Sequence, residues 1–237
     1  MSAIPLYGSV PAFGAPDLSP FVVKLEVWMR LAGLPYVKRQ GNPMKSPRGK
    51  MPWVDLDGVL VPDSHVILTT LAARNGIDLD ATLDADQRSR AHALRRMLED
   101  GFYFALMRSR WQEEDGWAAQ VPAFSRALPA FVAPLAVRAI RGTILKTLKS
   151  QGTGRYTREE FFENGAGDLR AVAQALGDRP WMFGDAPTNV DATALAMVWC
   201  CQDHPVDSPL RAAARDPRLV AYVRRFRDAH WKDAAFS

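Results

Sequence analysis

Cysteine is scarce in this chain of 237 residues, and the two that occur, Cys200 and Cys201, are adjacent. Adjacent cysteines exclude a disulfide framework and a cysteine-rich zinc site, and they fit the reducing cytosol. Because they fall in an apolar helical stretch, we expect both thiols to be buried and inert. His92, His204 and His230 show no metal-ligand spacing with one another or with the cysteines, so no metal site is expected.

Long hydrophobic runs are also missing. No stretch of about 18 consecutive apolar residues occurs, which argues against a transmembrane helix. The first residues, Met1 to Pro5, lack the basic-then-apolar pattern of a signal peptide. Hydrophobic residues make up 48% of the chain, which is enough for one large domain or two modest ones. These features predict a soluble, cytoplasmic protein.

Acidic residues are absent between Gly116 and Thr157, in a chain whose formal net charge is +4. Such a stretch forms either a solvated helix face over apolar stems, the commoner case, or a surface that approaches anionic lipid or nucleic acid. No nucleic-acid-binding motif accompanies it, so we expect no nucleic-acid partner, while weak contact with a membrane surface stays open. Its basic residues are Arg126, Arg138, Arg141, Lys146, Lys149 and Arg155.

The first 77 residues combine strand and helix signals. Ser19-Pro20 is a strong helix start, and Gly33 ends that helix. Asp57-Gly58 indicates the turn of a hairpin. The expected elements are a strand at 4–7, a helix from 19 to 33, a strand at 35–37, the hairpin, and a helix from 63 to 76. This order predicts a thioredoxin-like α/β domain over residues 1–77.

From residue 78 onward the sequence predicts helices and no convincing strand. Ala91, Leu94, Leu98, Phe102 and Ala105 mark one apolar face of a long helix. Further helix starts are indicated by capping pairs and by an aspartate followed by proline: Asp84 with Gln87, Thr157 with Glu160, Thr188 with Asp191, and Asp216-Pro217. We therefore predict an all-helical domain over residues 78–237.

Two short motifs carry the functional hypothesis. Pro52 precedes an apolar strand and cannot donate to its ladder. If the Met51–Pro52 bond is cis, the backbone N–H and C=O of Met51 turn outward, free to pair with an extended ligand. The Asp63-Ser64 pair puts a carboxylate and a hydroxyl near a helix N-terminus, which suits a zwitterionic ligand end. An amino-acid end held beside a strand-like backbone describes glutathione.

Four segments together carry a family resemblance: 18–26 (LSPFVVKLE), 46–52 (SPRGKMP), 151–155 (QGTGR) and 181–191 (WMFGDAPTNVD). In this order and spacing they resemble the glutathione S-transferase superfamily, and the first three are similar to its failed-axon-connections (Fax) and metaxin-like branch. The resemblance covers nearly the entire chain. It implies the cytosolic glutathione-transferase fold, glutathione as cosubstrate, and a homodimer.

The resemblance also assigns roles to residues of the first domain. It implies that the backbone of Met51, before the cis-Pro52, pairs with the cysteinyl unit of glutathione. Asp63 and Ser64 would bind the γ-glutamyl end. Lys50 could pair with the glycyl carboxylate, although an exposed lysine before a strand is an equal alternative. The branch often has a cysteine where this chain has Val22, so a second thiol is absent.

The glutathione thiol reacts as a thiolate, so its pKa must fall from roughly 8.5 toward neutrality. Ser19 supplies a hydroxyl at a helix N-terminus, and both features favour the thiolate. Its alternative role is that of a simple N-cap. Tyr7, at the end of the first strand, is the rival candidate. Because position 19 is not cysteine, we expect addition or substitution on an electrophile instead of mixed-disulfide chemistry.

On the long helix, Tyr103, Met107 and Trp111 could line an apolar pocket for the second substrate, although core packing explains most such residues. The leading hypothesis is a glutathione transferase that conjugates a small apolar electrophile, as in detoxification. The alternative is a non-catalytic Fax- or metaxin-like adaptor that keeps the fold. In that case the basic, apolar stretch from Val132 to Leu148 would contact a membrane or a protein partner.

Overall fold

The computed structural model describes residues 2–126, 128 and 131–231. Both predicted domains, and the basic stretch from Arg126 to Arg155, include a few positions outside the described residues: 1, 127, 129–130 and 232–237. All strands of the described chain end before residue 63, and helices make up the part beyond residue 77. The predicted α/β and all-helical parts are therefore confirmed, while the boundary between residues 77 and 78 stays a prediction.

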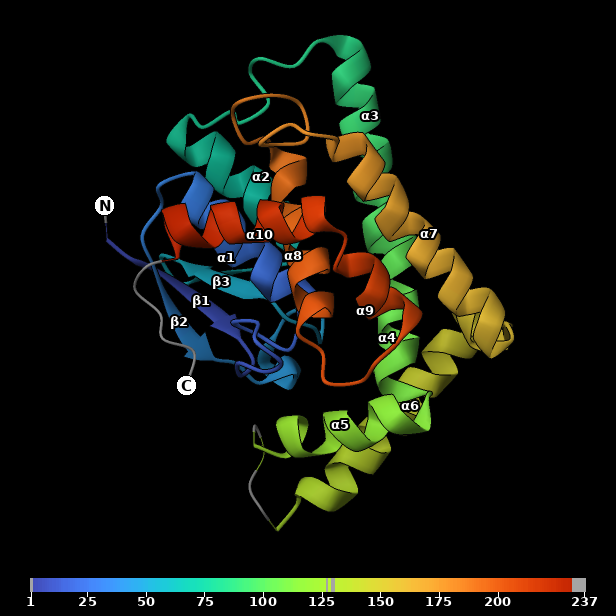
Figure 1. The fold of residues 1–237 in the computed structure, drawn as a ribbon. Coiled ribbons are helices and arrows are strands. Elements are labelled where there is room, and N and C mark those ends of the chain that lie inside the picture. The colour runs from blue at the N-terminus through green and yellow to red at the C-terminus, as the bar shows by residue number, and fades with distance from the viewer. Residues whose placement is uncertain (1, 127, 129–130, 232–237) are drawn as a thin grey trace.

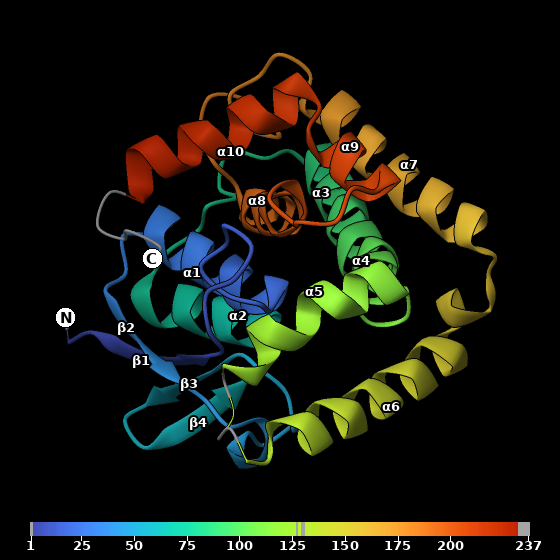
Figure 2. The same cartoon turned by 60° about the horizontal axis from the view of Figure 1, so that its bottom comes forward.

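The first part is built on a mixed sheet (Figure 1). Its strands are β1 (Ile4–Gly8), β2 (Tyr36–Gln40), β3 (Trp53–Leu56) and β4 (Val59–Pro62). Among the described residues they form one sheet in the order β2-β1-β3-β4, in which only β1 and β2 run parallel. Helices α1 (Pro20–Leu31) and α2 (Ser64–Asn75) pack between the sheet and the other helices (Figure 2), and a short 3-10 turn, η1 (Pro43–Lys45), follows β2. This confirms the thioredoxin-like arrangement.

The long helix predicted on Ala91 to Ala105 is present, but it is not uniform. Its first part is α3 (Ala85–Arg96) and its last part is α4 (Tyr103–Trp111). Between them lies a π-helical segment, η2 (Met97–Phe102). Wider π turns are frequent at functional sites, and a search for 3.6-residue periodicity does not reveal them. The remaining elements are α5 (Glu114–Ser125), α6 (Ala133–Gln151), η3 (Thr153–Arg155), α7 (Arg158–Leu176), α8 (Asn189–Gln202), α9 (Pro209–Ala214) and α10 (Pro217–His230).

Helix α8 is the centre of the core, surrounded by α1, α3, α9 and α10 (Figure 2). Every residue from Val190 to Gln202 is buried. The indole N–H of Trp28 on α1 donates to the Asn189 side chain at 2.7 Å. Cys200 and Cys201 are buried as predicted, and burial raises the pKa of each thiol to about 12, so both stay protonated.

The three predicted capping boxes begin α3, α7 and α8. The last one differs from the others because it is buried. The Asp191 carboxylate accepts hydrogen bonds from the backbone N–H of Met182 at 2.9 Å and from the N–H and hydroxyl of Thr188, each at 2.7 Å. The hydroxyl of Tyr222 on α10 donates to the same carboxylate. This aspartate therefore joins the loop before α8, α8 itself and α10.

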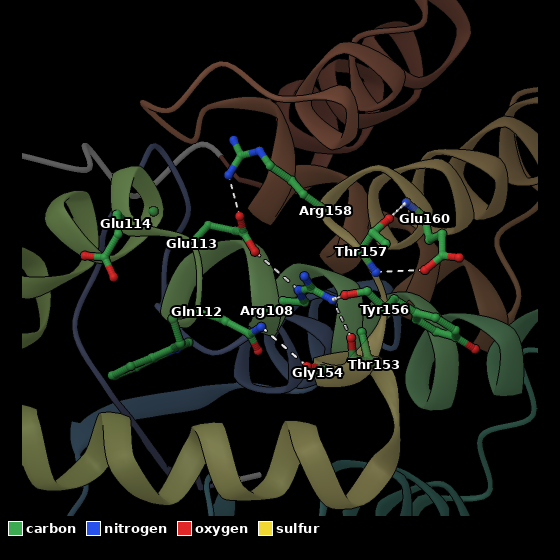
Figure 3. Close-up of polar contacts among 12 residues, drawn as sticks. Arg108, Gln112, Glu113, Glu114, Thr153, Gly154, Tyr156, Thr157, Arg158 and Glu160 are labelled. Carbon is green, nitrogen blue, oxygen red and sulfur yellow. Dashed lines mark hydrogen bonds and ion pairs between the residues drawn. The ribbon is translucent and has the colours of Figure 1, made fainter.

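The segment 151–155, one of the resemblance motifs, forms the turn between α6 and α7 (Figure 3). Buried Arg108 of α4 donates to the carbonyl oxygens of Thr153 at 2.6 Å and Tyr156 at 2.8 Å. A Cβ on Gly154 would lie only 2.9 Å from the backbone of Leu148, so this position needs glycine. The motif therefore has a structural role: it holds the turn between α6 and α7 against α4.

Within the described residues, no helix combines the length and the apolar character that crossing a bilayer requires.

Candidate functional site

A pocket of about 400 Å³ lies where the segment around β3, β4 and α2 faces α3, η2 and α4. Its volume falls in the range of small-molecule sites. Of the predicted site residues, Lys50, Met51, Pro52, Asp63, Ser64 and Tyr103 all line it. The remaining lining residues are Phe21, Arg48, His65, Arg95, Arg96, Glu99, Asp100 and Phe104.

The Met51–Pro52 peptide bond is cis, as the motif suggested. The Pro52 carbonyl accepts a hydrogen bond from the backbone N–H of Asp63 at 3.3 Å. This bond holds the two motifs side by side, although ten residues of hairpin separate them in the sequence. The backbone thus brings both predicted binding motifs to one wall of the pocket.

Asp63 is the N-cap of α2, in an uncommon conformation with φ +79°. One carboxylate oxygen accepts from the backbone N–H groups of His65 at 3.0 Å and Val66 at 3.2 Å. The other oxygen lies 3.4 Å from the Arg48 guanidinium. Strained backbone of this kind occurs disproportionately at ligand sites. Asp63 is thus fixed at the pocket edge by its own helix and by Arg48.

Predicted Ser64 belongs to a charged cluster whose other members, Lys24, Arg95, Glu99 and Thr193, were not predicted. Ser64, Arg95 and Glu99 line the pocket. The Lys24 ammonium is 2.6 Å from one Glu99 carboxylate oxygen and donates to the Ser64 hydroxyl at 3.3 Å. Arg95 pairs with the other Glu99 oxygen at 2.9 Å, and Thr193 donates to the first at 3.1 Å. The cluster therefore joins α1, α2, α3, η2 and α8 at the wall of the pocket.

Burial shapes the charge states of this cluster. Burial lowers the pKa of Lys24, although the negative charge of Glu99 opposes this shift by favouring the protonated ammonium. Burial also disfavours the charged form of Glu99, but Lys24 and Arg95 outweigh it and hold the pKa of this carboxyl below its usual range. Burial and the nearby Arg95 and Lys24 lower the pKa of His65, so its imidazole is neutral at pH 7. One sequence signal pointed here: Lys24 falls on the apolar stripe of Phe21, Leu25 and Trp28, where a charge needs a partner.

The pocket is positively charged overall. Four basic side chains and three carboxylates line it, and buried Lys24 adds a further cation behind Ser64. Part of the lining is aromatic: the Tyr103 ring packs against Phe21 at 4.7 Å and Phe104 at 5.4 Å between centroids. Burial raises the pKa of Tyr103 to about 12, so its hydroxyl keeps its proton. The pocket thus offers charged groups for an anionic ligand together with aromatic rings and a hydroxyl.

Four predicted residues are not among the described residues that line this pocket. Ser19 is the N-cap residue of α1, its backbone N–H donates to Asp17 at 2.8 Å, and its side chain makes no capping bond. Tyr7 stacks on Trp53 with 5.0 Å between ring centroids. Trp111 is buried and packs against other aromatic rings, and Met107 is half-buried on the same helix. The hypotheses on all four stay predictions.

Comparison with known proteins identifies the family. The model of the glutathione S-transferase N-terminal domain matches residues 20–116, and that of the C-terminal domain matches residues 165–226. The isoprene-epoxide–glutathione S-transferase of a Rhodococcus species is 32% identical, over 94% of this chain and 98% of its own length. The chain belongs to the glutathione S-transferase family. Glutathione is the cosubstrate of this transferase family.

Other similarities agree with this assignment. Failed axon connections of Drosophila melanogaster is 30% identical over 92% of this chain, which spans 56% of that protein. Human metaxin-2 is 21% identical over 88% of the chain. The fold is shared with glutathione transferase GSTFuA3 from Phanerochaete chrysosporium, which covers 99% of both chains with a TM-score of 0.67 and 14% identity. The predicted fold and the Fax-like branch of this transferase family are therefore confirmed.

The charged lining of the pocket suits glutathione. Glutathione carries two carboxylates, one ammonium group and, when activated, a thiolate. Arg48, Lys50 and Arg95 offer donors for carboxylates, and Asp63 and Glu99 offer acceptors for the ammonium group. The net positive charge of the transferase pocket matches the net negative charge of the tripeptide.

Proposed function

We propose that this chain is an active glutathione transferase that conjugates glutathione to a small apolar electrophile. The observation that carries the proposal is the meeting of five predicted glutathione-binding residues with Tyr103 in one pocket. A pocket that only supported the fold would not need charged residues of both signs beside aromatic residues. The name of the Rhodococcus relative suggests an epoxide as the class of electrophile.

In this proposal the tripeptide lies along the wall formed by the two motifs. Lys50 binds the glycyl carboxylate, the backbone of Met51 pairs with the cysteinyl unit, and Asp63 and Ser64 hold the γ-glutamyl end. The positive N-terminus of α1 and the Ser19 hydroxyl stabilise the thiolate. Phe21, two residues after Ser19, lines the pocket, so the start of α1 adjoins the site.

The chemical step is a nucleophilic addition. The glutathione sulfur forms a bond to one epoxide carbon, and the bond from that carbon to the ring oxygen breaks. The oxygen keeps the electron pair and takes a proton. Tyr103 is suited to donate it, because its hydroxyl remains protonated at neutral pH. Water then restores the proton to Tyr103.

The test combines calorimetry with kinetics. We expect the wild-type protein to bind glutathione at millimolar concentration or below and Asp63→Ala to bind it at least tenfold more weakly. No heat of binding to the wild type would refute the enzymatic proposal. Ser19→Ala should lose turnover while retaining binding. Ser208→Ala is the matched control, because Ser208 is also an N-cap before a proline, on α9. Full activity of Ser19→Ala would transfer the role to Tyr7, tested as Tyr7→Phe.

A second candidate function, contact with an anionic membrane surface, is favoured by the exposed face of α6. Leu135 is 78% exposed there, and Arg138, Lys146 and Lys149 are exposed as well. At about 100° per residue these four side chains fall within a quarter-turn of the helix. Val137 and Leu148, on the opposite side, are buried. A basic face with an apolar residue suits the surface of an anionic bilayer.

Vesicle co-sedimentation tests this adaptor-type function. We expect binding to phosphatidylserine-containing vesicles that high salt abolishes and that neutral phosphatidylcholine vesicles do not show. Replacing Arg138, Lys146 and Lys149 by Gln should remove it. The control replaces the exposed Arg90 on α3, Arg179 in the loop after α7, and Arg224 on α10. Equal binding by the two triple variants would refute a specific role for α6.

A further inference from the structure

We propose that Lys24 is a specificity-determining residue of the glutathione site: it supplies the cation that recognises the α-carboxylate of the γ-glutamyl unit from below Ser64. This inference rests on the proposed function and extends it to a residue of α1 outside the tripeptide-binding motifs. It connects the γ-glutamyl end to the helical part indirectly, since the partner of Lys24 is Glu99 of η2.

The first argument is the position of the ammonium group. Lys24 is 1% exposed, yet its ammonium reaches the hydroxyl of Ser64, which lines the pocket. A hydroxyl that accepts from an ammonium group has its own proton free to donate. Ser64 can therefore donate to a carboxylate in the pocket while Lys24 strengthens that bond by its charge.

The second argument is an imbalance of buried charge. Lys24 and Arg95 are two cations that share one carboxylate, Glu99. Asp63, a further carboxylate whose charge acts on Lys24, already accepts two backbone N–H groups and pairs with Arg48, and in the proposed function it faces the ammonium group of the ligand. Buried surplus charge is unfavourable unless a partner supplies the opposite sign. A ligand carboxylate above Ser64 would balance the cluster.

The third argument is that Glu99 does not account for both contacts of Lys24. Arg95 pairs with Glu99 at 2.9 Å and Thr193 donates to it, so Lys24 is one of three partners of this carboxylate. Lys24 makes the largest contribution to the low pKa of Glu99, yet its ammonium also donates to Ser64, a residue that lines the pocket. The contact with Ser64 points to a role toward the pocket.

The experiment compares two tripeptides on the full-length protein by calorimetry. One is glutathione, and the other is 4-aminobutyryl-Cys-Gly, which lacks only the α-carboxylate and keeps the amine. Because a charge-assisted hydrogen bond contributes about 1.5–3 kcal/mol, we expect the wild type to prefer glutathione by roughly tenfold to a hundredfold. Lys24→Met should lose most of this preference by binding glutathione more weakly, with the affinity for the analogue unchanged.

Two further variants separate recognition from structural support. Glu99→Gln removes the carboxylate that favours the charged form of buried Lys24, so this variant should lose part of its preference for glutathione. Arg96→Met removes a cation that lines the same pocket but pairs with Asp100 at 2.6 Å, so it should keep the wild-type preference. If Lys24→Met does not fold, Glu99→Gln decides alone, because an unchanged or larger preference in that variant overturns the proposal.

The outcomes distinguish this inference from the proposed function. A wild type that binds neither tripeptide refutes both. A wild type that binds glutathione and the analogue equally well refutes only the role of Lys24. An equal loss of affinity for both tripeptides in Lys24→Met would identify a structural role and also overturn the inference. Selective loss of glutathione binding supports it.

Discussion

Replacement of Asp191 by alanine provides the sharpest test of how the fold is held together. The carboxylate is fully buried and accepts four hydrogen bonds, from Met182, from the N–H and hydroxyl of Thr188, and from Tyr222. Each buried donor left without a partner destabilises by about 1–3 kcal/mol. Because local relaxation lets some donors find new acceptors, we expect a loss of about 4 kcal/mol in the free energy of unfolding.

The matched control is Glu160→Ala. Glu160 occupies the same third position of the capping box of α7, where it accepts the backbone N–H of Thr157 at 2.7 Å. That box is exposed, so water replaces the lost acceptor and the expected loss is only about 0.5–1 kcal/mol. Urea unfolding with an unchanged m-value measures both variants. Equal losses in the two variants would show that burial does not set the contribution of the box.

Three further predictions concern packing, pH and the α6–α7 turn. Gly116→Ala should destabilise the protein by more than about 3 kcal/mol, since its Cβ would lie 1.8 Å from the Ser109 carbonyl oxygen. In the control, Gly142→Ala, the Cβ meets no atom within 4 Å, so this variant should be more stable by about 0.5–1 kcal/mol in thermal unfolding. Burial first, and then Arg110, lowers the pKa of His204 to about 3 from its usual 6.5. Between pH 6.5 and pH 3 the unfolded chain therefore binds a proton at His204 that the native state does not bind. The free energy of unfolding that this residue contributes above pH 6.5 is lost as the pH falls toward 3. Between pH 6.5 and pH 4.5 the wild type should lose about 2 kcal/mol more than His204→Gln, and identical pH profiles would contradict this. Arg108→Lys should lose about 2 kcal/mol in urea, because ammonium cannot reproduce two guanidinium bonds to carbonyl oxygens, and a loss below about 0.5 kcal/mol would contradict the role of this turn.

Local sequence patterns predicted the elements well because their causes are local. A serine, threonine or aspartate three residues before its capping partner defines a helix start whatever surrounds it, and the boxes at Asp84, Thr157 and Thr188 are confirmed. The αL conformation of Gly76 ends α2 for the same reason. The π segment η2 escaped prediction because it depends on how the long helix packs and not on its apolar period.

The site was predictable where it is made of one continuous segment. Residues 50–64 bring their own strand, turn and helix start, so the cis proline and the capping aspartate could be read directly. The opposite wall of the pocket could not be predicted from the sequence, because the pair between Lys24 and Glu99 joins residues 75 apart. The surroundings of Trp111 could not be predicted either. Its position on the long helix suggested that it lines a pocket, but its ring packs against Trp117 and Phe124.

The contacts between α1 and the helical part limit how modular this chain can be. The pairs of Lys24 with Glu99 and Trp28 with Asn189 both cross the expected boundary after residue 77. A fragment that ends there would leave the buried Lys24 ammonium without its carboxylate partner, and the loss of such a partner lowers the free energy of unfolding by about 3–5 kcal/mol. A chimera that takes its second half from another transferase must therefore carry Glu99 and Asn189 along. These two contacts therefore make the stability of each part depend on the other.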